Sequence, residues 1–258
     1  MRASALSRLA IFSFGLGTTV ALVPASAQTL ANGSFEQSGG SFTGWSTIGS
    51  TSIANITNTQ PSLTPTNGSF QAFISNNGSG AVAVNNTLDS FFNVNNIALP
   101  ADTLNRVPTN GSGILQTFSV SGASVLSFDV KSVTAEVPNS QWDIMFYIVD
   151  GKITVLPNPD ATGANPNNSF GVTVSTNSGP DSYTYGYNYQ TITVALAAGT
   201  HTIGFGVYNT GDQDVNSGLF IDNVTVVPEP ATYALLGGGL VFLALGRRRR
   251  CARLQTRA

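Results

Sequence analysis

Short runs in which apolar and polar residues alternate recur through the middle of the chain. Four such runs cover residues 126–131, 142–148, 192–196 and 203–207. Successive side chains of a β-strand point to opposite faces, so each run predicts a strand with one buried face. Trp142 shares its parity with the apolar residues that follow it, and we expect it, like Trp45, to lie in the core.

Turn residues separate these runs. Asp150-Gly151 lies between residues 142–148 and 152–155 and predicts a two-residue type I′ hairpin. No long stretch between the two ends of the chain repeats apolar residues at helical spacing, so we expect strands and loops only. Strands at this spacing with polar turns predict an all-β fold, a two-sheet antiparallel β-sandwich.

The start of the chain has the pattern of an export signal. Arg2 and Arg8 precede an apolar run over residues 9–23, and Ala25 and Ala27 provide small residues for cleavage. The pattern predicts a helical signal peptide over residues 1–27 that signal peptidase removes. A permanent anchor is the alternative, but the run is shorter than the ~20 residues a membrane span needs.

The end of the chain has three parts in a fixed order. Pro228, Glu229 and Pro230 are followed by an apolar segment, residues 231–246, and then by an arginine-rich tail, residues 247–258. As a helix the apolar segment reaches about 24 Å, less than the ~30 Å of a hydrocarbon core, which favours a transient anchor. A cluster of four arginines follows, Arg247, Arg248, Arg249 and Arg250. It predicts that this end stays in the cytoplasm and stops transfer of the chain across the membrane.

This order resembles the PEP-CTERM sorting signal of bacterial exosortase systems, covering residues 228–258. The resemblance implies export through the inner membrane, transient anchoring there, and processing by an exosortase-like enzyme at or near Pro228, Glu229 and Pro230. The product would then reside at the cell surface or in the extracellular matrix. An ordinary single-pass protein with a chance Pro-Glu-Pro is the alternative.

Charge changes the picture of the remaining domain. Residues 28–227 contain three basic and twelve acidic residues, which gives a net charge of −9. Such a surface repels nucleic acid and favours cations or neutral polymers. The chain's single cysteine, Cys251, lies outside this domain, and its single histidine is His201. The domain therefore has no disulfide and lacks the ligands of the usual zinc or iron sites, whereas a calcium site with oxygen ligands remains possible.

Four segments in this domain carry a second resemblance. They are NGSFEQSGGSFTGW (32–45), GILQTFSV (113–120), LSFDV (126–130) and LFIDNVTVV (219–227). Their order resembles galactose-binding-like, jelly-roll carbohydrate-binding modules, which implies a jelly-roll sandwich that binds extracellular polysaccharide. The resemblance also implies a structural calcium ion between the first and last strands, at Glu36 and Asp222. The alternative is that each carboxylate accepts hydrogen bonds from loop N–H groups.

Tyr183, Tyr185, Tyr187 and Tyr189 stand at every second position. In one uninterrupted strand their rings share a face opposite the core and form a platform on which sugars stack. Gly186 leaves open a bulge that would distribute the rings between the core edge and a loop. A second cation loop at Asp212 and Asp214 lacks the other ligands of an EF-hand, so we expect a solvated turn there.

Catalysis has less support in the sequence than binding. His201 shares its parity with the apolar residues 203–207, which predicts the edge of the core rather than a base. No Gly-x-Ser-x-Gly turn is present, and nothing pairs Glu36 with Glu136, the domain's glutamates, as hydrolysis of a glycoside requires. We therefore predict a non-catalytic module. A jelly-roll glycan hydrolase or lyase, and a structural adhesin or ice-binding protein, are the alternatives.

Overall fold

A computed structural model describes most of the predicted domain. The described residues are 30–55, 63–77, 80–95, 97, 108–136, 143–157, 172–176, 179–211 and 215–229. The predicted signal peptide with Ala25 and Ala27, the apolar segment 231–246 and the arginine cluster 247–250 lie outside them. Within the described part of the chain, no helix is long and apolar enough to cross a membrane.

The first sheet has the strand order β1-β5-β13-β7-β8, with β4 paired to β5. All of its pairs are antiparallel. The strands are β1 (Ser46–Ile48), β4 (Val82–Ala83), β5 (Pro108–Val120), β7 (Ile144–Val149), β8 (Lys152–Val155) and β13 (Gly199–Thr210).

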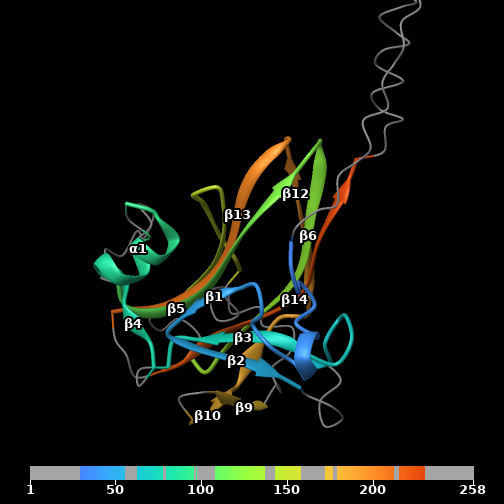
Figure 1. Cartoon of the computed structure of the whole chain (residues 1–258). Coiled ribbons are helices and arrows are strands. Elements are labelled where there is room, and N and C mark those ends of the chain that lie inside the picture. The colour runs from blue at the N-terminus through green and yellow to red at the C-terminus, as the bar shows by residue number, and fades with distance from the viewer. Residues whose placement is uncertain are drawn as a thin grey trace, which may run out of the picture.

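The second sheet has the order β11-β6-β14-β3-β2, with β12 also paired to β6, and it too is antiparallel. Its strands are β2 (Ser50–Ala54), β3 (Gln71–Ser75), β6 (Ser124–Thr134), β11 (Tyr185–Gly186), β12 (Gln190–Leu196) and β14 (Ser217–Pro228). A separate hairpin, β9 (Val172–Thr176) with β10 (Gly179–Tyr183), contacts β2. Figure 1 shows the two sheets packed face to face.

The predicted two-sheet antiparallel sandwich is therefore confirmed, with one local difference. A short helix, α1 (Asp89–Phe92), follows a π-helical turn, η3 (Val84–Leu88), where we expected only strands and loops. It lies beside β4 and β5 (Figure 1), and its buried Phe92 packs on Phe146 of β7. A 3-10 turn, η1 (Gln37–Gly39), precedes β1.

The main core lies between the sheets, on the faces that alternation predicts for β6 and β13. Leu126, Phe128 and Val130 of β6 are at most 3% exposed, and so are Ile203, Phe205 and Val207 of β13. Trp45 is 7% exposed, and its ring lies 5.4 Å from Phe35 and 6.1 Å from Phe205, so its predicted core position is confirmed. In β7 the predicted face is wrong. Met145 and Tyr147 face the main core, whereas Phe146 and Ile148 pack in a separate cluster with Phe92 of α1, which covers that side of the sheet. Trp142 lies outside the described residues.

Asp150 and Gly151 form the predicted hairpin turn between β7 and β8. Both have positive φ angles, 51° and 78°, as the central residues of a type I′ turn must. His201, on β13, lies beside this turn: its Nδ1 is 2.7 Å from Asp150 Oδ2 and its Nε2 is 2.9 Å from the carbonyl oxygen of Ala197. His201 is 9% exposed, at the core edge where the alternation predicts it.

Candidate functional site

Glu36 holds one end of a short loop, residues 66–70. Its Oε1 accepts hydrogen bonds from the backbone N–H groups of Ser69, at 2.8 Å, and Phe70, at 2.6 Å. Both donors belong to the turn that leads into β3, so the carboxylate fixes the start of that strand. The loop thereby joins the segment before β1 to the second sheet.

Asp222 holds the other end of the same loop. It is fully buried in β14, and its Oδ2 accepts from the N–H of Asn67 at 2.8 Å and the hydroxyl of Thr66 at 3.2 Å. Its Oδ1 accepts from the N–H of Asn223 at 2.6 Å, where the register with β6 shifts. Burial raises the pKa of Asp222 to about 6, although these hydrogen bonds act in the opposite direction.

The two carboxylates predicted to bind calcium therefore converge on one loop. The hydrogen bonds to loop N–H groups already provide partners for both, as the alternative interpretation expected. Among the described residues, no three His, Cys, Asp or Glu side chains form a group that could hold a metal ion. An ion at this loop would thus use Glu36, Asp222 and amide, hydroxyl or carbonyl oxygens. Asp212 and Asp214 lie outside the described residues.

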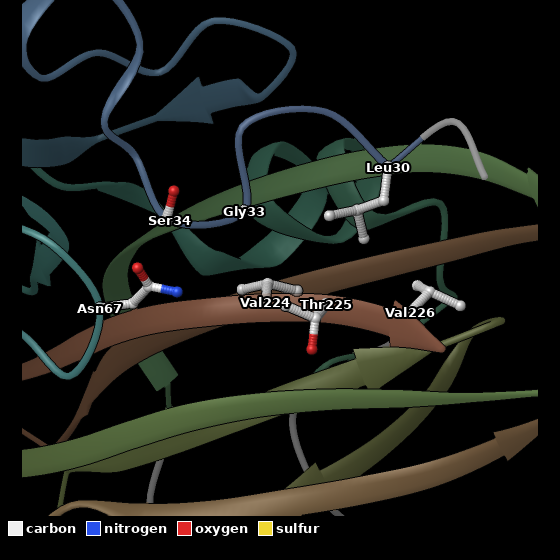
Figure 2. Close-up of a pocket in the computed structure, with 7 residues that line it drawn as sticks. All are labelled: Leu30, Gly33, Ser34, Asn67, Val224, Thr225 and Val226. Atoms are coloured by element: carbon white, nitrogen blue, oxygen red, sulfur yellow. The ribbon is translucent and has the colours of Figure 1, made fainter. Parts of the chain in front are cut away.

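A groove of about 300 Å³ runs beside this loop (Figure 2). One wall is the segment before β1 and the other is the last part of β14, and the N–H of Val224 donates to the carbonyl of Gly33 at 2.8 Å. The lining residues are Leu30, Gly33, Ser34, Asn67, Val224, Thr225 and Val226. Figure 2 shows Leu30 and Val226 at one end and Ser34 and Asn67 at the other.

The groove combines apolar and neutral polar groups. Leu30, Val224 and Val226 provide apolar surface, while Ser34 and Asn67 provide a hydroxyl and an amide. None of its lining residues carries a charge. Such a surface suits an uncharged ligand that has both an apolar face and hydroxyl groups, because a few placed polar groups orient a ligand whose remaining area is apolar.

The predicted platform of four exposed tyrosine rings is wrong at Tyr183. This side chain is 1% exposed, its ring lies 5.6 Å from Phe73, and its hydroxyl is 2.9 Å from Ser75 Oγ. The chain bends at Thr184, so β10 ends at Tyr183 and does not continue as one strand into β12. The tyrosines therefore do not share one face.

Tyr189 also packs against the protein. Its hydroxyl donates to Gln71 Oε1, and Lys131 Nζ lies 5.6 Å from the centre of its ring. Burial raises the pKa of Tyr189. Tyr185, Tyr187 and Tyr189 are all half-buried. Because the hydroxyl and ring of Tyr189 contact Gln71 and Lys131, Tyr185 and Tyr187 are the better candidates for contact with a ligand.

A buried polar network, which the sequence pattern did not single out, joins the two sheets at one end. Asn76 Nδ2 donates to Asp143 Oδ2 at 2.7 Å, and Asn209 Nδ2 donates to the carbonyl of Asn76 at 3.1 Å and to Asn110 Oδ1 at 2.6 Å. Ser217 N donates to Asn76 Oδ1 at 2.7 Å. Asparagine is common in loops, so only the three-dimensional arrangement identifies this cluster.

The first residues of the predicted processing motif belong to the sandwich. β14 continues to Pro228, which stands opposite Ser124 of β6. The N–H of Glu229 donates to the carbonyl of Ala123 at 2.9 Å. Pro230 lies outside the described residues.

Comparison with known proteins identifies this end of the chain. Residues 226–250 match the family model of the PEP-CTERM protein-sorting motif. The motif indicates export and C-terminal sorting to the cell surface, as the sequence resemblance implied. No curated protein matches the sequence.

Several solved structures are similar to the sandwich. A family 61 carbohydrate-binding module in complex with β-1,4-galactotriose is 12% identical, over 79% of this chain and 100% of its own, with a TM-score of 0.40. A family 35 carbohydrate-binding module from an environmental isolate is 16% identical over 72% and 91%, with a TM-score of 0.27. The enzymatically active domain of tailspike protein 4 from bacteriophage CBA120 is 10% identical over 78% and 21%, with a TM-score of 0.34.

Proposed function

We propose that this protein is exported, processed by an exosortase-like enzyme at or near Pro228, Glu229 and Pro230, and associates with neutral extracellular polysaccharide through a non-catalytic β-sandwich. The observation that carries the binding proposal is the groove between residues 30–34 and 224–226, which is uncharged and offers both apolar and hydroxyl or amide groups. Tyr185 and Tyr187 form a second candidate contact for the same ligand.

The chemistry of the groove supports binding rather than catalysis. Hydrolysis of a glycoside uses two carboxyl groups that flank the scissile bond. The residues that line the groove include no carboxylate and no imidazole. The nearby carboxylates of Glu36 and Asp222 both accept backbone N–H groups of loop 66–70, a structural role.

The charge of the domain supports a neutral polymer. Twelve acidic and three basic residues between 28 and 227 give a negative surface that disfavours an anionic glycan. A neutral sugar avoids this repulsion, because it presents C–H faces to apolar side chains and hydroxyl groups to amides.

Asn67→Ala is expected to weaken retention on a neutral polysaccharide about fivefold, since loss of one hydrogen bond costs about 1 kcal/mol. The backbone N–H that pins the loop on Asp222 stays in place. Affinity electrophoresis of the purified protein in gels containing bacterial exopolysaccharides measures the effect. Val155→Ala, a change of an exposed side chain on β8, is the matched control.

The other outcomes of this experiment separate the remaining interpretations. If the double change Tyr185→Ala and Tyr187→Ala weakens retention and Asn67→Ala does not, the tyrosines bind the glycan. If a folded protein is retained on no polysaccharide, the binding proposal is wrong. Release of shortened oligosaccharides would identify a hydrolase or lyase.

We also propose that calcium binds at Glu36 and Asp222. An ion would stabilise two carboxylates that approach one loop and would offset the burial that raises the pKa of Asp222. At ten times its dissociation constant, free calcium should raise the free energy of unfolding by about 1.4 kcal/mol.

Thermal unfolding in calcium and then in chelator measures this difference. Glu36→Gln keeps an oxygen acceptor for the loop N–H groups but removes the charge, so it should abolish the response to calcium. An equal response in the variant would contradict the site, and no response in the unaltered protein would contradict calcium binding.

A further inference from the structure

The sorting motif and the sandwich share residues. The matched motif begins at Val226, yet β14 extends to Pro228 and remains paired with β6 along its last residues. The pairs are Val226 with Leu126, Val227 with Val125, and Pro228 with Ser124. The motif therefore does not begin after the folded domain; its first residues are the end of a central strand of the second sheet (Figure 1).

Pro228 is compatible with this pairing. Glu229 N donates to the carbonyl of Ala123, and backbone groups of a strand point alternately to its two neighbours. The backbone nitrogen of Pro228 therefore faces away from β6, on the side where Val224 N donates to Gly33. Since no hydrogen bond to β6 needs an N–H at this position, proline is tolerated and the strand continues through it.

We infer that the end of β14, residues 226–229, must detach from β6 before the sorting enzyme can act on the motif. This inference rests on the proposed processing at Pro228, Glu229 and Pro230. An enzyme that cleaves a peptide bond must surround the extended backbone next to that bond, including both of its hydrogen-bonding edges. While residues 226–229 are paired, β6 occupies one edge of this backbone, so the folded sandwich controls access to the processing site.

The packing sets how far the strand can open. Val227 is 57% exposed, and Pro228 and Glu229 are exposed too, so few side-chain contacts oppose their release. Val224 is 1% exposed and belongs to the main core. Ends of elements with few buried contacts open at low free-energy cost. Opening is therefore expected to stop near Val226 and to leave the rest of the sandwich folded.

A reversible clamp tests the inference in cells that carry the sorting system. Val125→Cys with Val227→Cys, in full-length protein that also carries Cys251→Ser, places two cysteines at a hydrogen-bonded cross-strand pair. The Cα separation of such a pair, about 5.5 Å, lies within the range of disulfides. Pulse-chase immunoblots then follow the conversion of the precursor to the shorter processed form, and a thiol-labelling assay follows the disulfide.

The expected result is loss of the processed form when the clamp is oxidised and its recovery when a reductant is added. Val125→Gly leaves the motif unchanged but weakens the opposing strand, and should speed processing. Val155→Gly, at an exposed position in the other sheet, is the matched control and should leave the rate unchanged.

Two outcomes contradict the inference, and they differ in whether the proposed processing also fails. If the unaltered precursor is shortened and the oxidised clamp is shortened at the same rate, the strand need not detach, while processing itself stands. If the unaltered precursor is never shortened, the proposed processing is wrong and the inference is lost with it.

Discussion

Gly33→Val is expected to lower the free energy of unfolding by about 3 kcal/mol, the upper part of the usual range for overpacking. A Cβ atom at Gly33 would lie 1.8 Å from the carbonyl oxygen of Val224 and 2.9 Å from Leu30 Cδ2. The first neighbour is backbone of β14, which cannot move without disturbing its pairing with β6. The segment before β1 must therefore shift, which breaks its hydrogen bond to Val224 and deforms the groove.

Gly122→Val is the matched control, because a Cβ there meets nothing within 4 Å. Urea unfolding followed by tryptophan fluorescence gives the free energy of both variants. Gly33→Val should also weaken retention on polysaccharide, since it changes the walls of the groove. Stability equal to that of the unaltered protein would contradict the close approach of these two segments.

The strands that form the main core could be predicted because their signal is local. Residues 126–130 and 203–207 alternate with period two, and each face that this period marks is buried in the structure. The hairpin at Asp150-Gly151 was equally local, since its two residues adopt the positive φ that the turn requires. Which strands pair, and in what order, was not contained in these short patterns.

The tyrosine positions were predicted incorrectly because the alternation of the tyrosines does not show that the outer face of the second sheet is also apolar and has to be covered. Phe73, Val133 and Phe220 lie on the outer face of that sheet, and the β9–β10 hairpin with Tyr183 covers them. The sequence held one signal of this, since the last strand is apolar on both parities and such a strand is buried on both faces. A cover was therefore required, and Tyr183 belongs to it.

The candidate site was predicted only in part. The resemblance to carbohydrate-binding modules led to Glu36 and Asp222, and the structure brings both to loop 66–70. The groove was not predicted, because its walls, residues 30–34 and 224–226, are far apart in the chain and show no shared pattern. The resemblance could indicate the roles of single residues, but not a surface that two distant segments form together.

Stability of the unaltered protein is expected to fall as pH rises from about 4 to about 8, by an amount of the order of a few kcal/mol, and Asp143→Asn should remove most of this dependence. Asp143 is fully buried in the polar network that joins the two sheets. Burial raises its pKa to about 8, and the carboxyl group of Glu136 adds to this effect, while hydrogen bonds such as that from Asn76 oppose it.

The direction of the dependence follows from proton binding. Between the unfolded pKa, about 4, and the folded pKa, about 8, the native state holds a proton on Asp143 that the unfolded chain does not. Unfolding then releases a proton, so each rise in pH within this window favours the unfolded chain. The contribution is fully present below the unfolded pKa and is lost as pH passes the folded one.

Asparagine imitates the protonated acid, with one acceptor oxygen and a donor group in the same place, and it carries no proton to lose. Urea unfolding of both proteins is measured from pH 4.5 to pH 8.5. Asp222 and His201 titrate in both proteins, so the difference between the two profiles is the contribution of Asp143. Equal slopes would mean that Asp143 is ionised throughout, held by an interaction that outweighs its burial. A clearly shallower slope in the variant would instead show that the polar network between the sheets contains a neutral acid at physiological pH.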